Sequence, residues 1–365
     1  MKIKTTKEPL LKTAQILQNV ISNKTTLPVL ANFLMETQKD KIYLAATDLD
    51  MGISFNLPVE ILEEGSITIP AKKFSDIVRD IPEGDIQITI KKNNSISIES
   101  QRCFFRLMGL PKEEFPKLPR LLDRERIVLT QHVLKNMLSL TSFAVSSDET
   151  RYTLTGVLFV VKDNKLRLVA TDGRRLALME KALDIPCGFS KEAIVPLKAI
   201  QELARNLKDT GDVTIIFGKN QISFQFEDIT IISRLIEGQF PDYEKVIPKE
   251  ESKYKININR ERFLWAVKRV ALLTSPNSQS IKLDLFKDKL VFSKNCAETG
   301  EAREELDIEY QGAEFSIGFN PQYLIDVLKS IPHQTVGFEL TVPESPGVIR
   351  TEDNYIYIVL PMQFS

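Results

Sequence analysis

Hydrophobic residues recur along this 365-residue chain with the 3.6-residue period of helices that bury one face. Three such stripes occur, each near the start of a stretch of about 125 residues. They are Leu10, Leu11, Ala14, Leu17 and Ile21; Val133, Leu134, Met137, Leu138 and Phe143; and Phe263, Leu264, Val267, Val270 and Ala271. We therefore expect three amphipathic helices, each packed on its own core.

A second pattern, in which apolar and polar residues alternate, predicts half-buried antiparallel strands. It occurs at residues 85–90, 95–98 and 212–217. Residues 41–45 and 165–169 are also expected to be strands. Sheet and helix therefore follow each other along the chain, which is typical of an α+β fold.

The chain also repeats itself at intervals near 125 residues. The block at 69–79 returns at 195–205 and, more faintly, at 319–329. Residues 46–48 match 170–172 at an offset of 124, and Phe115-Pro116 matches Phe240-Pro241 at 125. We predict three copies of one domain, with boundaries at 1–122, 123–248 and 249–365.

Each copy is expected to contain a second helix, which begins at Pro70, Pro196 or Pro321. Proline suits the first turn of a helix because its missing N–H would be unpaired there in any case. The prediction is thus three tandem domains, each with two helices and antiparallel sheet.

Composition places the chain among ordinary globular proteins, with 43% hydrophobic and 27% charged residues. No apolar run approaches the roughly 18 residues that a membrane span needs. Residues 1–7 carry charge and no apolar segment follows them, so we expect no secretory signal and a cytoplasmic protein.

Cysteine and histidine are too few for the commonest site chemistries. Cys103, Cys187 and Cys296 form no C-x-x-C pair, and the histidines are only His132 and His333. This pattern predicts no disulfide framework, no zinc or other metal site and no Ser-His-Asp triad. No phosphate-binding loop or acid–base pair of carboxylates stands out. We expect no cofactor and no catalysis.

Charge is unevenly placed although the net charge is only −1. The six expected helical segments sum to +8, so the remainder of the chain sums to −9. A basic helical surface would attract a polyanion such as nucleic acid. The alternative is that lysine and arginine occur there for helix propensity alone. No base-reading motif is present, and Trp265 is assigned to the core in preference to a stacking role.

Several short strings, taken together and in order, resemble one family. They lie at residues 26–30, 70–74, 151–152, 170–177, 240–243 and 360–362. On these strings the chain resembles the bacterial DNA polymerase III beta subunit, the replicative sliding clamp, from about residue 1 to the C-terminus.

The resemblance implies a non-catalytic processivity factor in DNA replication. Such a clamp is a head-to-tail homodimeric ring whose helices line a pore around duplex DNA, without sequence preference. It tethers the DNA polymerase III alpha subunit, the clamp loader, other polymerases and repair factors through their short linear motifs.

The resemblance also implies DNA contacts at Lys24, Lys72 and Tyr152. Two residues depart from the better-known family members: Asp148 replaces a glutamine and Thr153 replaces a tyrosine. Because a carboxylate repels phosphate, Asp148 puts detailed DNA contact near it in doubt.

A groove for partner peptides is implied in the same way, beside the turn that Asp172-Gly173 predicts. Arg174 departs from a frequent histidine and Leu360 from a frequent methionine, and both departures imply a changed peptide preference. The implied groove residues are Leu154, Thr171, Gly173, Arg174, Arg175, Leu176, Pro241, Val246, Tyr323, Ile358, Leu360, Pro361 and Met362.

The dimer interface is implied to join Phe105 and Leu107, on an edge strand, to Leu272 and Leu273 of the partner chain. Ordinary core packing is the alternative for this strand. For the whole chain two other functions remain open. One is a DNA-acting enzyme, which needs a carboxylate cluster that we do not find, and the other is a monomeric scaffold that binds peptides.

Overall fold

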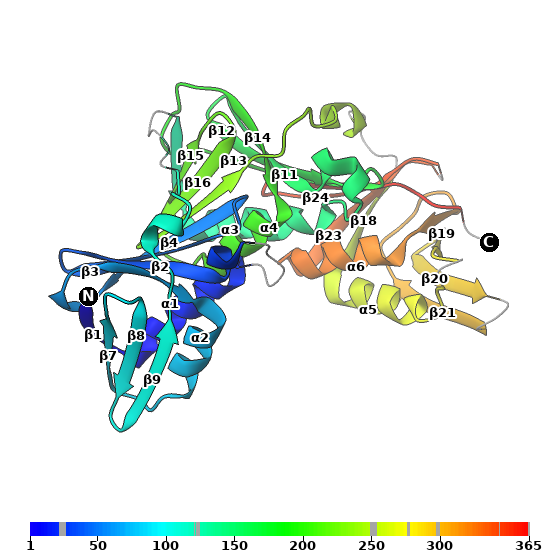
Figure 1. Ribbon diagram of the computed structural model, residues 1–365. Helices are drawn as coiled ribbons and strands as arrows, with labels where there is room; N and C mark the ends of the chain where they lie inside the picture. The colour runs from blue at the N-terminus through cyan, green and yellow to red at the C-terminus, as the bar shows by residue number, and fades with distance from the viewer. Residues whose placement is uncertain are drawn as a thin grey trace. The chain divides into compact units, whose positions relative to one another are not determined.

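The computed structural model describes residues 1–21, 27–119, 121, 125–248, 254–275, 278–296, 300–342 and 344–363. The chain forms two compact units, which are described separately (Figure 1). The first unit comprises Met1–His132 with Gln201–Leu235, and the second comprises Val133–Ile200 with Ile236–Ser365.

The first unit holds two antiparallel sheets and two packed helices. One sheet has the order β5-β1-β7-β8-β9 and the other β10-β15-β16-β17-β4-β3-β2-β6. The elements are β1 (Lys2–Thr6), α1 (Lys7–Val20), η1 (Pro28–Ala31), β2 (Asn32–Gln38), β3 (Lys41–Thr47), β4 (Met51–Pro58), β5 (Glu60–Glu63), β6 (Ser66–Pro70), α2 (Ala71–Asp80), β7 (Asp85–Ile90), β8 (Ser95–Ser100), β9 (Cys103–Met108), η2 (Lys112–Glu114), β10 (Arg126–Thr130), β15 (Asp212–Phe217), β16 (Gln221–Phe226) and β17 (Ile229–Arg234).

The second unit also holds two antiparallel sheets, β14-β11-β12-β13-β25-β24-β23-β18 and β21-β20-β19-β22. Helices α3 (Gln131–Thr141) and α4 (Leu197–Asn206) each run across a boundary between the units. The other elements are η3 (Ser142–Ala144), η4 (Glu149–Leu154), β11 (Gly156–Lys162), β12 (Lys165–Thr171), β13 (Arg175–Ala182), β14 (Lys191–Pro196), η5 (Tyr243–Val246), β18 (Tyr254–Asn259), α5 (Arg260–Ala271), β19 (Ile281–Phe286), β20 (Lys289–Cys296), β21 (Gly300–Asp307), β22 (Phe315–Phe319), α6 (Pro321–Ser330), β23 (Thr335–Leu340), β24 (Gly347–Thr351) and β25 (Tyr355–Val359).

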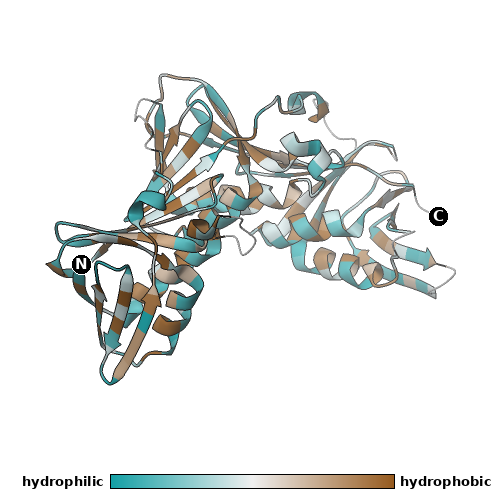
Figure 2. Cartoon of the chain, in the orientation of Figure 1, coloured by the Kyte–Doolittle hydropathy of each residue, from teal (hydrophilic) through white to brown (hydrophobic). Residues whose placement is uncertain are grey.

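Hydrophobic and hydrophilic residues are interspersed along the helices and strands (Figure 2), and many of the hydrophobic ones are buried in the core. Helix α1 packs against α2 and onto β3 and β4, and helix α5 packs against α6 and onto β20 and β21. Leu10, Ala14 and Leu17 are buried on α1, and Phe263 and Val267 are buried on α5. The α+β prediction of two helices per repeat is confirmed by the six α-helices within the described residues.

The prolines of the second helices occupy a different place from the one predicted in two of the three copies. Pro321 is the first residue of α6, as expected. Pro70 and Pro196, however, end strands β6 and β14, and the helices begin one residue later. Both strands lie at sheet edges, where a residue without an N–H is tolerated.

The Ala-Thr-Asp strings of the first two copies fold into the same turn, which supports the repeat. In each turn the aspartate Oδ1 accepts two backbone N–H groups: Asp48 from residues 50 and 51, and Asp172 from residues 174 and 175. In each, the residue after the aspartate has a positive φ, +80° at Leu49 and +84° at Gly173. The prediction of a turn at Asp172-Gly173 is confirmed.

The assignment of Trp265 to the core is wrong. Its side chain is 52% exposed on α5, and the Lys268 Nζ lies 4.4 Å from the centre of its ring. Trp265 is two residues from Phe263 and two from Val267. Side chains two residues apart on a helix are separated by about 200° around its axis. Trp265 therefore points away from the face that those two residues bury.

Candidate functional site

A groove of about 160 Å³ opens in the second unit, where β12, β13 and β25 meet the segments η4 and η5. We call this hollow the groove. Its lining is mostly apolar, with arginines at its rim. It is lined by Arg151, Leu154, Thr171, Gly173, Arg174, Arg175, Leu176, Pro241, Asp242, Tyr243, Val246, Ile358 and Leu360.

The floor of the groove is part of a hydrophobic core. Leu176 and Ile358 pair across β13 and β25, and both side chains are buried. Leu154 packs into the same cluster. The walls are different, because Val246 and Leu360 expose large parts of their side chains. A buried apolar floor with exposed apolar walls is suited to the anchor residues of a short peptide.

The turn between β12 and β13 shapes one side of the groove. Gly173 has φ +84°, and a Cβ added to it would lie 2.5 Å from the guanidinium of Arg151. That arginine donates from Nη1 to the carbonyl oxygen of Asp172 at 2.8 Å. The positive φ and the close approach of Arg151 therefore both favour glycine at position 173, although Leu49 adopts a similar angle in the first copy.

Arg175 joins three segments behind the groove. Its Nε and Nη1 donate to the carboxylates of Asp172 at 3.0 Å and Asp326 at 2.6 Å. Its Nη2 donates to the carbonyl oxygen of Phe143 at 2.7 Å, and its guanidinium lies 4.5 Å from the ring centre of Tyr323. The Arg175 side chain is only 10% exposed. It thus links the turn after β12 to α6 and to η3.

The structure gathers most, though not all, of the groove residues that the resemblance implies. Three of them, Tyr323, Pro361 and Met362, do not line the hollow itself, although Tyr323 stacks on Arg175. Three lining residues were not predicted: Arg151, Asp242 and Tyr243. All three belong to strings that carry the resemblance, at 151–152 and 240–243, so the signal was present in the sequence.

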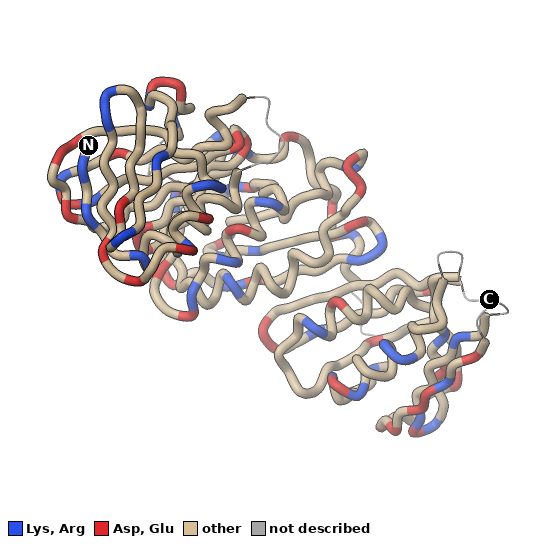
Figure 3. Tube along the Cα trace, turned by 60° about the horizontal axis from the view of Figure 1, so that its bottom comes forward, with Lys and Arg blue, Asp and Glu red and all other residues tan. Residues whose placement is uncertain are grey.

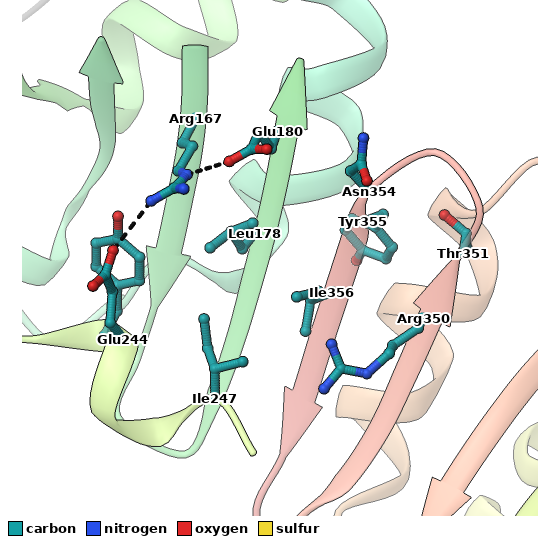
Figure 4. A pocket seen from close by; sticks show the side chains of 11 residues that line it. Arg167, Leu178, Glu180, Glu244, Ile247, Arg350, Thr351, Asn354, Tyr355 and Ile356 are labelled. Carbon is teal, nitrogen blue, oxygen red and sulfur yellow. Dashed lines mark hydrogen bonds and ion pairs between the residues drawn. The ribbon is translucent and has the colours of Figure 1, made fainter. Parts of the chain in front are cut away.

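A second, larger hollow of about 430 Å³ lies beside the groove, between η5 and the outer surface of the same sheet (Figure 4). We call it the η5 cavity. No pattern in the sequence predicted it. It is lined by Arg167, Leu178, Glu180, Tyr243, Glu244, Ile247, Arg350, Thr351, Asn354, Tyr355 and Ile356.

One wall of the η5 cavity is an ion-pair network. The Glu180 carboxylate accepts from Lys165 Nζ at 2.7 Å and from Arg167 Nε. Arg167 also donates from Nη1 to Glu244 on η5 at 3.1 Å. Burial would raise the pKa of the Glu180 carboxyl, but the hydrogen bonds from Lys165 and Arg167 outweigh burial and hold that pKa below its usual value.

The lowered pKa predicts how Glu180→Gln changes stability with pH. A depressed folded-state pKa stabilises the protein above the unfolded value of about 4.3, and this contribution is lost as the pH falls through the folded-state pKa. We expect the variant to lose about 1 kcal/mol of unfolding free energy at pH 7 and less at about pH 4, which lies below the unfolded-state value. Urea unfolding at both pH values measures the difference. An equal loss at both would contradict the assignment.

The candidate DNA contacts are exposed where the structure describes them. Lys72 is exposed on α2, and Tyr152 is exposed on η4. Lys24 lies outside the described residues. Asp148 caps η4 by accepting from the N–H and the hydroxyl of Thr150, and these bonds lower the pKa of its carboxyl. Asp148 therefore remains an anion, which would repel a phosphate beside it.

The helices are slightly less basic than predicted. With the bounds given above, the six α-helices sum to +7, because Lys208 lies beyond the end of α4. Its Nζ pairs with the carboxylate of Glu227 at 2.6 Å. Lysines and arginines are interspersed with acidic residues along both units (Figure 3). The excess of positive charge on the helices therefore remains, at a modest size.

The candidate dimer contacts lie on an edge strand and at the end of a helix. Strand β9 is the outer strand of its sheet. Phe105 and Leu107 are half-buried on it, whereas Phe104 and Met108 are 54% and 59% exposed. Leu272, just after α5, is almost fully exposed. Phe104 and Met108 therefore offer more apolar surface to a partner than the two residues that the resemblance named.

The part of the chain that the structure describes contains neither a cluster of metal-binding side chains nor a membrane-spanning helix. No group of three or more His, Cys, Asp or Glu side chains there could hold a metal ion. No helix there is long and apolar enough to cross a membrane.

Comparison with family models finds three matches in tandem. Residues 1–119 match the N-terminal domain of the DNA polymerase III beta subunit, residues 128–242 its central domain and residues 244–363 its C-terminal domain. The chain is 33% identical over 347 residues to the beta sliding clamp of Chlamydia pneumoniae, covering 95% of this chain and 94% of that one. It is 35% identical over 362 residues to that of Pseudomonas aeruginosa, covering 98% of both.

Solved structures of similar proteins have the same fold over their full length. The sliding clamp of Pseudomonas aeruginosa bound to griselimycin has a TM-score of 0.95 at 34% identity, with complete coverage of both chains. The sliding clamp of Bacillus subtilis has a TM-score of 0.95 at 31% identity, also with complete coverage of both.

Proposed function

We infer the function of this chain from its family: it belongs to the DNA polymerase III beta subunit family. It is a sliding clamp, a non-catalytic processivity subunit that serves DNA replication. The observation that carries this conclusion is the run of three family domains in order over residues 1–363, with full-length structural similarity to sliding clamps.

The proposed assembly is a head-to-tail ring of two chains, in which β9 of one chain meets the α5 end of the other. Two chains contribute twelve helices. At about 9 Å between axes, these enclose a circle about 34 Å across, or about 24 Å once one helix width is subtracted. The two groove depths of B-DNA sum to about 16 Å, so a duplex fits loosely. Ring closure, more than affinity, then keeps the clamp on DNA.

The proposed contacts with DNA are electrostatic and independent of sequence. The basic excess on the helices supports them, as do the exposed side chains of Lys72 and Tyr152. Loose contact with phosphates permits sliding, because no single position is strongly preferred. Lys24 belongs to the same proposal on the resemblance alone. Because replication acts on chromosomal DNA, the proposed location of the protein is the cytoplasm.

The groove is the proposed docking site for partners. Its apolar floor and arginine rim fit short peptides with leucine or phenylalanine anchors. The partners proposed for it are the DNA polymerase III alpha subunit, the clamp loader, other polymerases and repair factors. A monomeric scaffold that binds such peptides without enclosing DNA is the second candidate, and the ring experiment separates the two.

Retention on circular DNA tests the ring. The protein is loaded onto a nicked circular plasmid by a matching clamp loader and passed through gel filtration in high salt. We expect it to remain with the circle and to be lost once the plasmid is linearised, because only a closed ring is linked topologically to DNA. Equal loss from both forms indicates ordinary electrostatic binding, and the ring proposal would then be wrong.

A matched pair of variants tests the interface by sedimentation and by the same retention assay. Leu272→Glu places a charge on the proposed interface, and Ile185→Glu places one at an exposed apolar residue elsewhere. We expect Leu272→Glu to sediment at the chain mass of 41.5 kDa and to leave the circle, and Ile185→Glu to sediment at twice that mass and to stay. Dimeric Leu272→Glu would contradict the proposed interface.

A further inference from the structure

The groove and the η5 cavity are neighbours along the same two strands. On β13, Leu176 lines the groove and Leu178 lines the η5 cavity. On β25, Ile358 lines the groove and pairs with Leu176. Ile356 lines the η5 cavity and pairs with Leu178. Residues two apart on a strand are about 6.6 Å apart and share a face. The hollows are thus one two-residue step apart, and Tyr243 lines both.

This spacing suits an extended peptide. Such a chain advances about 3.3 Å per residue. If one residue of a peptide is anchored in the groove, a residue two or three positions away can reach the η5 cavity. No rearrangement of the sheet is required, because Leu178 and Ile356 already form its floor.

The η5 cavity contains hydrogen-bond donors that have no acceptor among the residues that the structure describes. These donors belong to Arg350. Arg350 donates from Nε to Glu339 and from Nη2 to the carbonyl oxygen of Pro248, both at 3.2 Å. Its Nη1 has no partner within the described residues. Figure 4 shows the Arg350 guanidinium directed into the space between Ile247 and Ile356.

The acceptors in this cavity are already engaged to a greater extent. The two carboxylate oxygens of Glu180 accept from Lys165 and Arg167. Glu244 is largely exposed and accepts from Arg167. The Thr351 hydroxyl is buried and has no hydrogen-bond partner in the described part of the chain. An incoming cation would therefore find both oxygens of Glu180 occupied and only the exposed Oε2 of Glu244 open, whereas an incoming carboxylate would find the two N–H groups on Nη1 of Arg350 without a partner in the described residues.

We propose that the η5 cavity binds a glutamate side chain of the same peptide that docks in the groove. The methylene stem packs on Leu178 and Ile356, and the carboxylate accepts from Arg350, with Asn354 at the rim. A guanidinium matches a carboxylate in geometry as well as charge. This inference rests on the proposed function of the groove and adds a preference for acidic residues at one side of the apolar anchors.

Peptide binding to the full chain tests the proposal. Labelled peptides carry leucine and phenylalanine anchors, with glutamate or glutamine placed two or three residues away on either side. We measure their dissociation constants by fluorescence anisotropy. At one of these positions, we expect glutamate to bind about fivefold to tenfold more tightly than glutamine. If the ratio stays below twofold at every position, the proposal is wrong.

Variants assign the ratio to Arg350. In Arg350→Gln we expect the ratio of the glutamine-peptide to the glutamate-peptide dissociation constant to fall toward one. In Asn354→Ala we expect a smaller decrease in this ratio. Lys181→Gln is the matched control, because it removes a positive charge from an exposed residue of β13, next to Glu180. It should keep the ratio. An undiminished ratio in Arg350→Gln overturns the proposal while the groove stands. If no anchored peptide binds the unaltered chain, the groove assignment itself fails and this inference fails with it.

Discussion

Leu360→Glu is expected to weaken the binding of a leucine- and phenylalanine-anchored peptide by about 30-fold or more. Leu360 forms a wall of the groove and is 42% exposed, so its side chain is available to a ligand. A carboxylate there must lose its hydration when an apolar anchor docks, and removing a central apolar contact typically costs about 2 kcal/mol or more. The backbone N–H of residue 360 still donates to the carbonyl oxygen of Arg174, so the fold is retained.

Leu62→Glu is the control for this variant. Leu62 is 43% exposed, which is nearly the same as Leu360, but it lies on β5 in the other unit. Fluorescence anisotropy with the same labelled peptide should give the unaltered dissociation constant for Leu62→Glu. Tight binding by Leu360→Glu, or equal losses in the two variants, would show that the peptide docks elsewhere.

Arg175→Met is expected to destabilise the second unit by about 3–5 kcal/mol. Methionine cannot replace the two ion pairs, so the carboxylates of Asp172 and Asp326 lose their cation in a largely buried place. The Phe143 carbonyl oxygen also loses its donor. Such a loss should lower the urea midpoint of the affected transition by about 1–3 M. Circular dichroism during urea titration measures it.

Arg174→Met is the matched control for Arg175→Met. The two arginines are adjacent, but Arg174 is exposed at the rim of the groove. A surface substitution of this kind changes stability by about 0.5 kcal/mol at most. If the two variants lower the urea midpoint equally, the network around Arg175 is not what holds the turn, α6 and η3 together.

Most helices and strands were predictable because their patterns are local. A buried stripe or a period-two alternation is set by neighbours within a few residues, so it can be read without knowing the partner element. Strands β7 and β15 have the predicted bounds. The error at Trp265 was one of interpretation, because its angle on the helix places it opposite Phe263 and Val267. The positions of Pro70 and Pro196 were missed because a proline fits a helix start and an edge strand equally well.

Most residues of the groove could be named from the sequence, but their positions relative to one another in the fold could not. Its residues come from 151–176, 241–246 and 358–360, and they were named through resemblance to a family. Strands β13 and β25 bring the first and last of these together, although they lie about 180 residues apart. Alternation shows which face of a strand is buried, but it does not identify the strand that pairs with it.

The sequence by itself determined the repeat, the elements of each copy and the family, because periodicity and short ordered strings need no knowledge of distant contacts. Only the tertiary structure decided the pairing of β17 with β4 and of β13 with β25, the network around Arg175 and the existence of the η5 cavity. A cavity is the space left between η5 and the sheet. It depends on how segments far apart in the sequence pack, and no local pattern encodes it.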